Sequence, residues 1–306
     1  MSEILDVVVV GGGFAGCSAA LSLSRSAMTV KVVDAGYRRN VRSESVHSYL
    51  GIDGKSAFAT TAGFEQELER YQVPVIKDSI SKASFQAGIF YLETAARALI
   101  KTRYLILATG VEDLLPDLPG LEALWGRCIF NCLYCGAHEY QGRHLAVYGA
   151  GQAGYEDAIK AASWSKDVIF YLSEDSVLTA QQLSRLESTG VIIEPSNISH
   201  LVGVPSGGLR VFSVSGEVRN IDAMFLRSRV IPRLSLARDL GCELDTAGYI
   251  QLDRFGRTSR AGLYVCGDAS GQLFQAVGAA ADGNKVARQL HHDSLFSAKL
   301  SEVTGG

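Results

Sequence analysis

The sequence has no basic block, no aromatic-basic stripe and no apolar run long enough to cross a bilayer. Its 29 Lys and Arg residues are outnumbered by 32 Asp and Glu residues, and the formal net charge is -3. Nucleic acid is therefore not an expected partner, because proteins that bind it concentrate positive charge. The first residues, 1–6, show neither the basic region nor the cleavage site of a secretory signal. These absences predict a cytoplasmic protein that contacts no membrane and acts on small molecules or proteins.

Cysteine is also scarce, with six residues in a chain of 306. So few cysteines over this length exclude a disulfide framework. There is no second Cys-x-x-Cys and no histidine pair at zinc-ligand spacing, so no metal site is expected. Only Cys132 and Cys135 have the spacing of a pair that closes a small disulfide and exchanges it. The remaining four are predicted to be buried: Cys17, Cys128, Cys242 and Cys266.

The length and a hydrophobic content of 47% favour two domains with ample core. Near the N-terminus the pattern predicts a strand over 7–10, a glycine loop over 11–16, a helix over 15–26 and a strand over 30–33. This order is typical of a dinucleotide-binding βαβ unit. Gly11, Gly13 and Gly16 would provide the tight turn, the close approach to a pyrophosphate and the helix–sheet contact. Asp34 ends the second strand, where a ribose-binding acid is expected.

A second glycine loop over 149–154 predicts another dinucleotide site. The expected elements around it are a strand over 144–148, a helix over 155–163 and a strand over 168–172. Pro116, Pro119 and Gly120 indicate a linker between domains, and the chain is expected to cross back over 222–232. Further strands are expected over 104–108 and 262–268, with a helix over about 275–290.

Together these motifs resemble the low-molecular-weight thioredoxin reductase family of FAD disulfide oxidoreductases. They are the first glycine loop with Asp34, the Ala108-Thr109-Gly110 turn, the cysteine pair ahead of the second βαβ unit, and Gly267-Asp268 followed by Gln275-Ala276. The resemblance implies an α/β fold of two three-layer, Rossmann-like dinucleotide-binding domains. The FAD domain would be discontinuous, over 1–114 and 241–306, and the central domain over 115–240 would carry the cysteine pair and a pyridine-nucleotide-type site.

The resemblance also assigns site residues. FAD is expected to contact Gly11, Gly13, Phe14, Ala15, Gly16, Asp34, Ala35, Thr109, Gly110, Gly267, Asp268, Gln275 and Ala276. Asp268 would bind the ribityl chain. The backbone at Gln275 and Ala276 would meet the pyrimidine end of the flavin, where the N–H groups of a helix start stabilise negative charge. By the same resemblance Cys135 faces the isoalloxazine and Cys132 exchanges with an outside disulfide, while His47 and Tyr49 lie in a loop that approaches the flavin.

The sequence departs from the family at the NADPH site. Reductases of the family hold the 2'-phosphate with an HRRxxxR motif, whereas residues 172–178 here include Glu174 and no arginine. A phosphate about 4 Å from Glu174 would be repelled by about 1 kcal/mol in water and about 4 kcal/mol at a surface-like dielectric. Efficient use of NADPH is therefore not expected. The second site, formed by Gly149, Gly151, Gln152, Ala153, Gly154 and Glu174, is left with three interpretations: NADH binding, a second FAD, or a vestigial loop.

A second departure follows the cysteine pair. Gly136 stands where the family usually has an acid or a histidine. The stretch from Cys132 to Glu139 is similar to the Cys-x-Tyr-Cys-His-Gly-Tyr-Glu pattern of gliotoxin-type dithiol oxidases, with the histidine shifted along the chain. His138 is the candidate proton carrier for the dithiol, and Glu139 is the second candidate. The alternative interpretation is that both are solvent-exposed helix residues without a catalytic role.

The predicted activity is FAD-dependent disulfide oxidoreduction through Cys132 and Cys135, nearest to the ferredoxin-linked, diflavin-linked and gliotoxin-type members that lack the NADPH motif. In the reducing direction, a reduced ferredoxin, a flavin-type carrier or NADH would supply electrons for a thioredoxin-like disulfide. In the oxidising direction, a small dithiol would be closed and oxygen would accept the electrons. A flavin-binding redox sensor or scaffold that switches without turnover is an alternative from a different class. A homodimer is expected from the resemblance.

Overall fold

The computed structural model describes residues 3–173, 176–195, 197–271 and 274–303, with side chains through residue 296. The chain forms two compact units, and both are discontinuous in sequence. The first comprises Met1–Val41, Phe58–Glu112 and Ile231–Gly306, and the second comprises Arg42–Ala57 and Asp113–Val230. Within the described residues, no helix combines the length and the apolar character needed to cross a bilayer.

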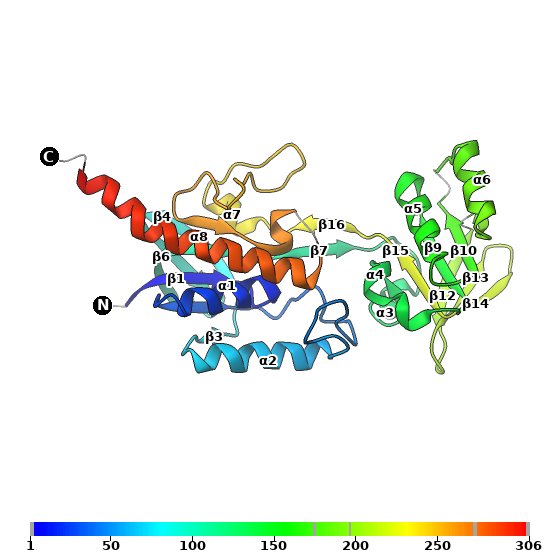
Figure 1. Cartoon of the computed structure of the whole chain (residues 1–306), viewed down its shortest axis with the longest axis horizontal. Helices are drawn as coiled ribbons and strands as arrows, with labels where there is room; N and C mark the ends of the chain where they lie inside the picture. The colour runs from blue at the N-terminus through cyan, green and yellow to red at the C-terminus, as the bar shows by residue number, and fades with distance from the viewer. Residues whose placement is uncertain (1–2, 174–175, 196, 272–273, 304–306) are drawn as a thin grey trace. The chain divides into compact units, whose positions relative to one another are not determined.

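The first unit is built on a seven-stranded sheet (Figure 1). Its strands are β1 (Ile4–Val10), β2 (Val30–Val33), β3 (Val75–Ile76), β4 (Ile80–Gln86), β5 (Ile89–Thr94), β6 (Leu99–Leu107) and β17 (Leu263–Val265). The order is β3-β2-β1-β6-β5-β4, and β17 pairs with the end of β6 beyond β5. β1, β2, β3, β6 and β17 are mutually parallel, whereas β5 runs antiparallel to both of its neighbours, β6 and β4.

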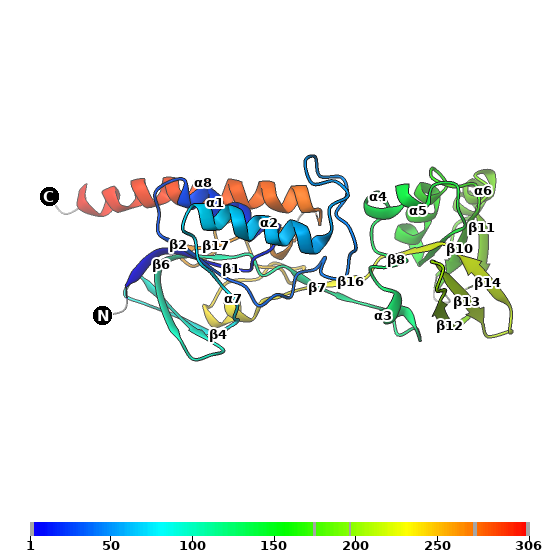
Figure 2. The same cartoon turned by 90° about the horizontal axis from the view of Figure 1, so that it is seen from below.

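Alternation along β1 divides this unit into three layers. Val7 and Val9 belong to the core cluster formed with helices α1 (Phe14–Ser24), α2 (Ala57–Arg70) and α8 (Ala276–Val303). Val8 and Val10 belong to the opposite cluster, formed with β4, β5 and α7 (Ser235–Asp239). All four valines are buried, as a parallel strand covered on both faces requires. Helices α1 and α8 lie side by side on one face of the sheet in both views (Figures 1 and 2).

The second unit has a five-stranded parallel sheet in the order β11-β10-β9-β15-β8. Its strands are β8 (Ile129–Phe130), β9 (Leu145–Gly149), β10 (Val168–Leu172), β11 (Ile192–Pro195) and β15 (Ala223–Leu226). One face is covered by α4 (Leu133–Gly136), α5 (Gly151–Ala161) and α6 (Ala180–Ser188). The other is covered by α3 (Leu121–Leu124) and an antiparallel sheet of β12 (Ile198–Gly203), β13 (Leu209–Ser213) and β14 (Val218–Ile221).

The chain passes between the units through β7 (Val111–Leu114) and β16 (Arg229–Pro232), which pair as a two-stranded ribbon. The expected α/β fold with two Rossmann-like units is confirmed. The boundaries differ from those expected in two places. The first unit resumes at Ile231 rather than at 241, because Leu236 and Ala237 of α7 pack into its core. Residues 42–57, expected in the FAD domain, belong to the second unit.

Two helices also differ from their expected bounds. α5 begins at Gly151, within the glycine loop rather than after it, and α8 continues well past 290. A polar cluster ties α8 to the sheet. Asp293 accepts hydrogen bonds from Arg257 Nε (2.7 Å), from Tyr264 Oη of β17 (2.6 Å) and from Gln289 Nε2 (2.9 Å). Burial alone would raise the pKa of Asp293, but these hydrogen bonds outweigh it and hold the pKa well below the usual range.

Because the folded-state pKa of Asp293 is depressed, its stabilising contribution is present above the unfolded-state pKa, near 4, and is lost as the pH falls below that value. We expect Asp293→Asn to lower the free energy of unfolding by about 1–3 kcal/mol at pH 7. The deficit relative to the wild type should shrink below pH 4. Urea denaturation at both pH values measures this. Arg103→Gln, which removes a more exposed ion pair with Asp6, serves as the control, and a deficit of the Asp293→Asn variant that is independent of pH would contradict the account.

Candidate functional site

Cys132 and Cys135 are joined by a disulfide, with their Cα atoms 5.2 Å apart. Cys132 is the N-cap of the one-turn helix α4, and Cys135 lies inside it. Leu133 and Ala137 are buried among β9 and α5 residues, so one side of the turn is anchored in the core. Cys132 is half-buried and Cys135 is exposed. Neither cysteine is therefore sealed from an external thiol.

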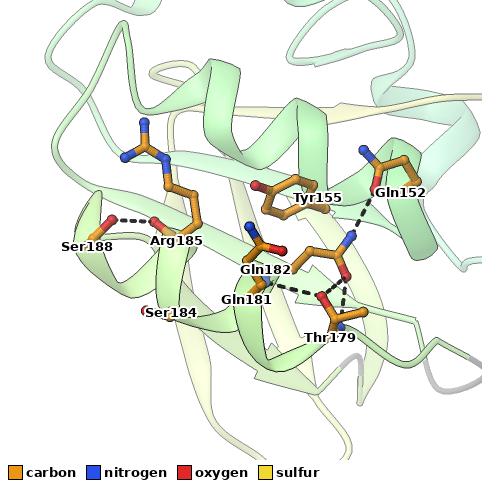
Figure 3. A pocket seen from close by; sticks show the side chains of 8 residues that line it. All are labelled: Gln152, Tyr155, Thr179, Gln181, Gln182, Ser184, Arg185 and Ser188. Carbon is orange, nitrogen blue, oxygen red and sulfur yellow. Dashed lines mark hydrogen bonds between the residues drawn. The ribbon is translucent and has the colours of Figure 1, made fainter.

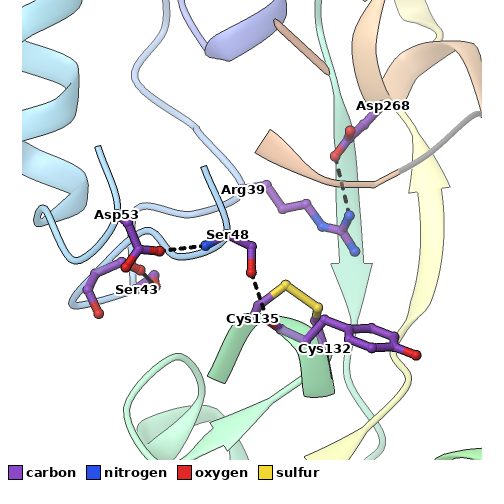
Figure 4. The surroundings of a disulfide bond; sticks show 9 residues. Arg39, Ser43, Ser48, Asp53, Cys132, Cys135 and Asp268 are labelled. Carbon is purple, nitrogen blue, oxygen red and sulfur yellow. Dashed lines mark hydrogen bonds and ion pairs between the residues drawn. A yellow bond between two sulfur atoms is a disulfide. The ribbon is translucent and has the colours of Figure 1, made fainter. Parts of the chain in front are cut away.

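The loop of residues 42–57 contacts this turn. The Ser48 hydroxyl donates to the carbonyl of Tyr134 at 3.2 Å, and the Ser48 amide donates to Asp53 Oδ1 at 2.7 Å (Figure 4). An antiparallel bridge between Val46 and Lys55 closes the loop on itself. Sequence reasoning missed this contact, because no local pattern connects residue 48 with the cysteine pair.

The two predicted proton carriers lie in the short 3₁₀ helix η1 (His138–Tyr140), and both are exposed. The His138 side chain makes no hydrogen bond or ion pair within the described part of the chain. The Glu139 carboxylate is 3.5 Å from Nε2 of His47. Their roles stay predictions, and His47 is a histidine that sequence reasoning assigned to the flavin environment rather than to this turn.

In the first unit, the glycine loop between β1 and α1 is shaped by close backbone contacts. Gly11 has a φ of +109°, and a Cβ there would lie 2.2 Å from the Ala108 carbonyl oxygen. A Cβ on Gly16 would lie 1.9 Å from the Gly11 carbonyl oxygen. Gly13, by contrast, borders open space, and as the N-cap of α1 it has no side chain that could cap the helix. The loop thus has the properties that a dinucleotide pyrophosphate requires: a close backbone approach and an uncapped helix N-terminus.

Asp34 lies beside this loop and is 5% exposed. Its Oδ1 accepts a hydrogen bond from the Gly12 amide at 3.0 Å, and its other oxygen contacts Arg38. Arg38 in turn donates to the Gly12 carbonyl at 3.0 Å. Asp34 therefore orders the glycine loop, and a role in ribose binding stays a prediction, as does that of the exposed Ala35.

The other predicted FAD residues of this unit lie near the same loop. A Cβ on Gly267 would lie 2.6 Å from Cβ of Ala15, and Asp268 pairs with Arg39 at 3.3 Å (Figure 4). Thr109 Oγ1 donates a hydrogen bond to the Arg233 carbonyl (3.1 Å), and the Arg233 amide donates one to the Gly110 carbonyl (3.2 Å). At the start of α8, the Ala279 amide donates to the Gln275 carbonyl (2.8 Å). Gln275 and Ala276 thus mark the start of α8. The structure brings together segments that are far apart in sequence.

The second glycine loop is used differently. Gly149 and Gly154 pack against each other, since a Cβ on Gly149 would lie 3.0 Å from Cα of Gly154. The Gly151 amide at the start of α5 already donates to the hydroxyl of Ser176 at 2.6 Å. Leu178, buried in the core, fixes the segment that carries Ser176. Glu174 lies outside the described residues.

A cavity of about 750 Å³ lies between α5 and α6 (Figure 3). Gln152 and Tyr155 line it from α5, and Gln182 and Arg185 line it from α6. The Gln182 amide donates to Gln152 at 2.8 Å, so the fourth residue of the glycine loop is engaged by a side chain of α6. Ala153 is half-buried in α5 and makes no polar side-chain contact.

Two Rossmann-like units, an uncapped glycine loop and a Cys-x-x-Cys disulfide define a dinucleotide-dependent disulfide oxidoreductase. A sequence profile of the pyridine nucleotide-disulphide oxidoreductases matches residues 5–283, and the chain belongs to this family. It is similar to thioredoxin reductase tcpT of Claviceps purpurea, with 30% identity over 97% of this chain and 96% of that protein. It is 27% identical to a thioredoxin reductase of Listeria monocytogenes, over 92% and 91% of the two chains.

Solved structures agree with this assignment. The crystal structure of HlmI matches with a TM-score of 0.91 at 28% identity, covering 99% of this chain and 96% of that one. An oxidoreductase from Agrobacterium tumefaciens matches with a TM-score of 0.89 at 28% identity, over 96% and 99%. The chain is an enzyme of the thioredoxin reductase-like type, which implies FAD binding. The open, uncapped first glycine loop fits that cofactor.

Of the four cysteines outside the pair, Cys17, Cys128 and Cys266 are buried as predicted, whereas Cys242 is only half-buried, because part of its surface stays open to solvent. All four should be inert. Burial raises the pKa of Cys17 to about 12 and that of Cys128 to about 11, and it raises the pKa of Cys242 and Cys266 as well. At pH 8 about 0.1% or less of the Cys17 and Cys128 thiols would be ionised, and the thiolate is the reactive form. Iodoacetamide with peptide mass spectrometry should therefore label none of the four in the native protein. After mild reduction it should label only Cys132 and Cys135; rapid native labelling of Cys17 would contradict this.

The close packing of the first glycine loop leads to a prediction about flavin binding. In Gly16→Ala the new methyl group would collide with the Gly11 carbonyl and displace α1 from the loop. We expect the purified variant to retain less than about a tenth of the wild-type flavin, a loss of about 1.4 kcal/mol or more in binding. Gly63→Ala is the matched control, because Gly63 lies in α2 with nothing near its Cβ position. Equal flavin absorbance in the two variants would argue against FAD at this loop.

Proposed function

We propose that the chain is an FAD-dependent dithiol–disulfide oxidoreductase whose Cys132–Cys135 disulfide exchanges with an external thiol partner. The accessible disulfide on α4 carries the proposal, because an exposed Cys-x-x-Cys turn is suited to attack by a second thiol. FAD, when bound, supplies a two-electron acceptor and donor for this pair. By resemblance, the first glycine loop, Asp268 and the start of α8 would hold it.

The exchange needs only the two cysteines and a proton carrier. An external thiolate attacks Sγ of Cys132, the disulfide breaks, and its electron pair stays on Sγ of Cys135. A second external thiolate then attacks the mixed disulfide and releases Cys132. In total two electrons and two protons pass from the external dithiol to the cysteines, and the reverse sequence reduces an external disulfide. His138 or Glu139 would carry the protons.

We also propose that NADPH is not an efficient electron donor. Two observations support this: residues 172–178 contain no arginine, and the Gly151 amide that would meet a pyrophosphate already donates to Ser176. The same contact argues against NADH or a second FAD on this loop. Gly149 and Gly154 are required by their mutual packing, so a vestigial nucleotide site would still retain them.

Because Ser176 occupies the Gly151 amide of the second glycine loop, one direction of the reaction is favoured. Without a pyridine nucleotide as reductant, electrons would enter from the thiol substrate, so the second candidate function is oxidation of a small dithiol with oxygen as acceptor. In the opposite direction, a reduced ferredoxin-type carrier would serve as donor and a thioredoxin-like protein as acceptor. A redox sensor without turnover stays the alternative of a different class. A homodimer and a cytoplasmic location are further proposals from the sequence.

The donor is tested by anaerobic mixing of the FAD-loaded protein with either dithiothreitol or micromolar NADPH. We expect the dithiol to bleach the flavin absorbance of the wild type, because its electrons enter through Cys132 and Cys135. NADPH should leave the absorbance unchanged on the same timescale. Cys135→Ser should respond to neither reagent. Rapid bleaching by NADPH would refute the proposed donor specificity, and equal bleaching of Cys135→Ser by the dithiol would refute the role of the disulfide.

A further inference from the structure

The loop of residues 42–57 is fixed to the unit that contains the disulfide. Arg42 Nη2 pairs with Glu122 Oε1 of α3 at 3.0 Å. The backbones also approach closely, because a Cβ on Gly126 would lie 2.7 Å from the Arg42 carbonyl oxygen. Gly126 has a φ of +79°, so a larger residue would be strained there as well. The loop is therefore held at its base, and its tip is held by the Val46–Lys55 bridge.

Ser48 at this tip supports the cysteine turn directly. A helix of four residues leaves its last carbonyl groups without internal partners, and the Ser48 hydroxyl supplies a donor to one of them, the Tyr134 carbonyl. Ser48 adopts a φ of +59°, a conformation that costs a non-glycine residue about 1 kcal/mol or more. The hydrogen bond that its backbone amide donates to Asp53 Oδ1 holds it in that conformation.

The neighbouring His47, at the same tip, contacts η1, the short helix that follows the cysteine turn. Its Nε2 atom is 3.5 Å from Glu139 Oε1 and 2.8 Å from Ser45 Oγ, and its Nδ1 atom is 3.7 Å from Asp53 Oδ1. His47 is 19% exposed, so this imidazole is shielded on most sides. Within the described residues, the charged groups that pair with it are Glu139 from η1 and Asp53 from its own loop.

Glu139 in turn lies about one helical turn after Cys135 along the chain. Ala137 has helical backbone angles, and its amide donates to the Leu133 carbonyl, so the helical path of α4 continues into η1. Side chains about one turn apart on such a path lie near one another. Cys135 and Glu139 have this spacing, and both are exposed.

We propose that His47 and Glu139 form the proton-transfer couple of the Cys132–Cys135 dithiol, with His47 as the positioning residue and Ser48 holding the couple to α4. The proposal rests on the thiol–disulfide exchange proposed above. The Glu139 carboxylate, paired with His47, takes the proton from the attacking external thiol as its sulfur bonds to Sγ of Cys132. It returns that proton to Sγ of Cys135, which keeps the electron pair of the broken disulfide. The second external thiol delivers its proton to Cys132 in the same way.

The test is the rate at which dithiothreitol reduces the disulfide, measured between pH 5.5 and 9 in the FAD-loaded protein by acid quench, maleimide labelling and mass spectrometry. We expect His47→Gln and Glu139→Gln each to slow the reaction about tenfold to a hundredfold at pH 7. Both should approach the wild-type rate at high pH, where the reagent thiol ionises without help. The double variant should be no slower than the slower single variant, because the two residues act as one unit.

His144→Gln is the matched control, because His144 pairs with Asp167 at 2.5 Å in the same unit. It should leave both the rate and its pH profile unchanged. Ser48→Ala and Ser48→Gly should both slow the reaction, although glycine relieves the backbone strain, because both remove the hydroxyl.

Slowing of His47→Gln by the same factor at every pH, or slowing of His138→Gln alone, would overturn the inference. A wild-type disulfide that dithiothreitol does not reduce at any pH would instead overturn the proposed function.

Discussion

The burial of Leu133 and Ala137 determines where the two sulfur atoms lie. A helix of four residues has no stability of its own, so its orientation comes from the apolar side chains that it buries. Leu133 and Ala137 are 5% and 0% exposed and pack into the cluster beneath β9 and α5. The opposite side of the turn, with Tyr134 and Cys135, is therefore held at the surface. All chemistry proposed for this chain depends on that division of a single helical turn.

The two glycine loops show that similar sequence patterns support different uses. In both, the last glycine lets a helix pack against its strand, as Gly16 does against Gly11 and Gly154 against Gly149. What differs is the start of the helix. In the first loop the Gly12 amide, ahead of α1, donates to Asp34, whereas in the second loop the Gly151 amide within α5 itself donates to Ser176. Anions bind at helix N-termini, and in the second loop a hydroxyl already occupies the first helical amide, so the first loop is the better candidate dinucleotide site.

The fold was largely predictable because it follows from patterns local in sequence. The run from Val7 to Val10 reads as a strand buried on both faces, and it is one. The unit boundary at α7 was not predictable, because it depends on which of the two cores Leu236 packs into. The placement of residues 42–57 was not predictable either, because it depends on long-range contacts such as that of Ser48 with Tyr134. For the same reason, no sequence pattern could have predicted that His47 contacts Glu139. Ser176 carries no local signal either, since serine is common in loops after strands.

The central claim is that Cys132 and Cys135 form a redox centre that exchanges electrons with the bound flavin. An anaerobic dithionite titration of the purified, FAD-loaded protein tests this most directly. A flavin and a disulfide each accept two electrons. The account therefore predicts that the wild type consumes about twice as many electrons per chain as Cys132→Ser before its flavin is fully reduced. Equal consumption by the two proteins would contradict it.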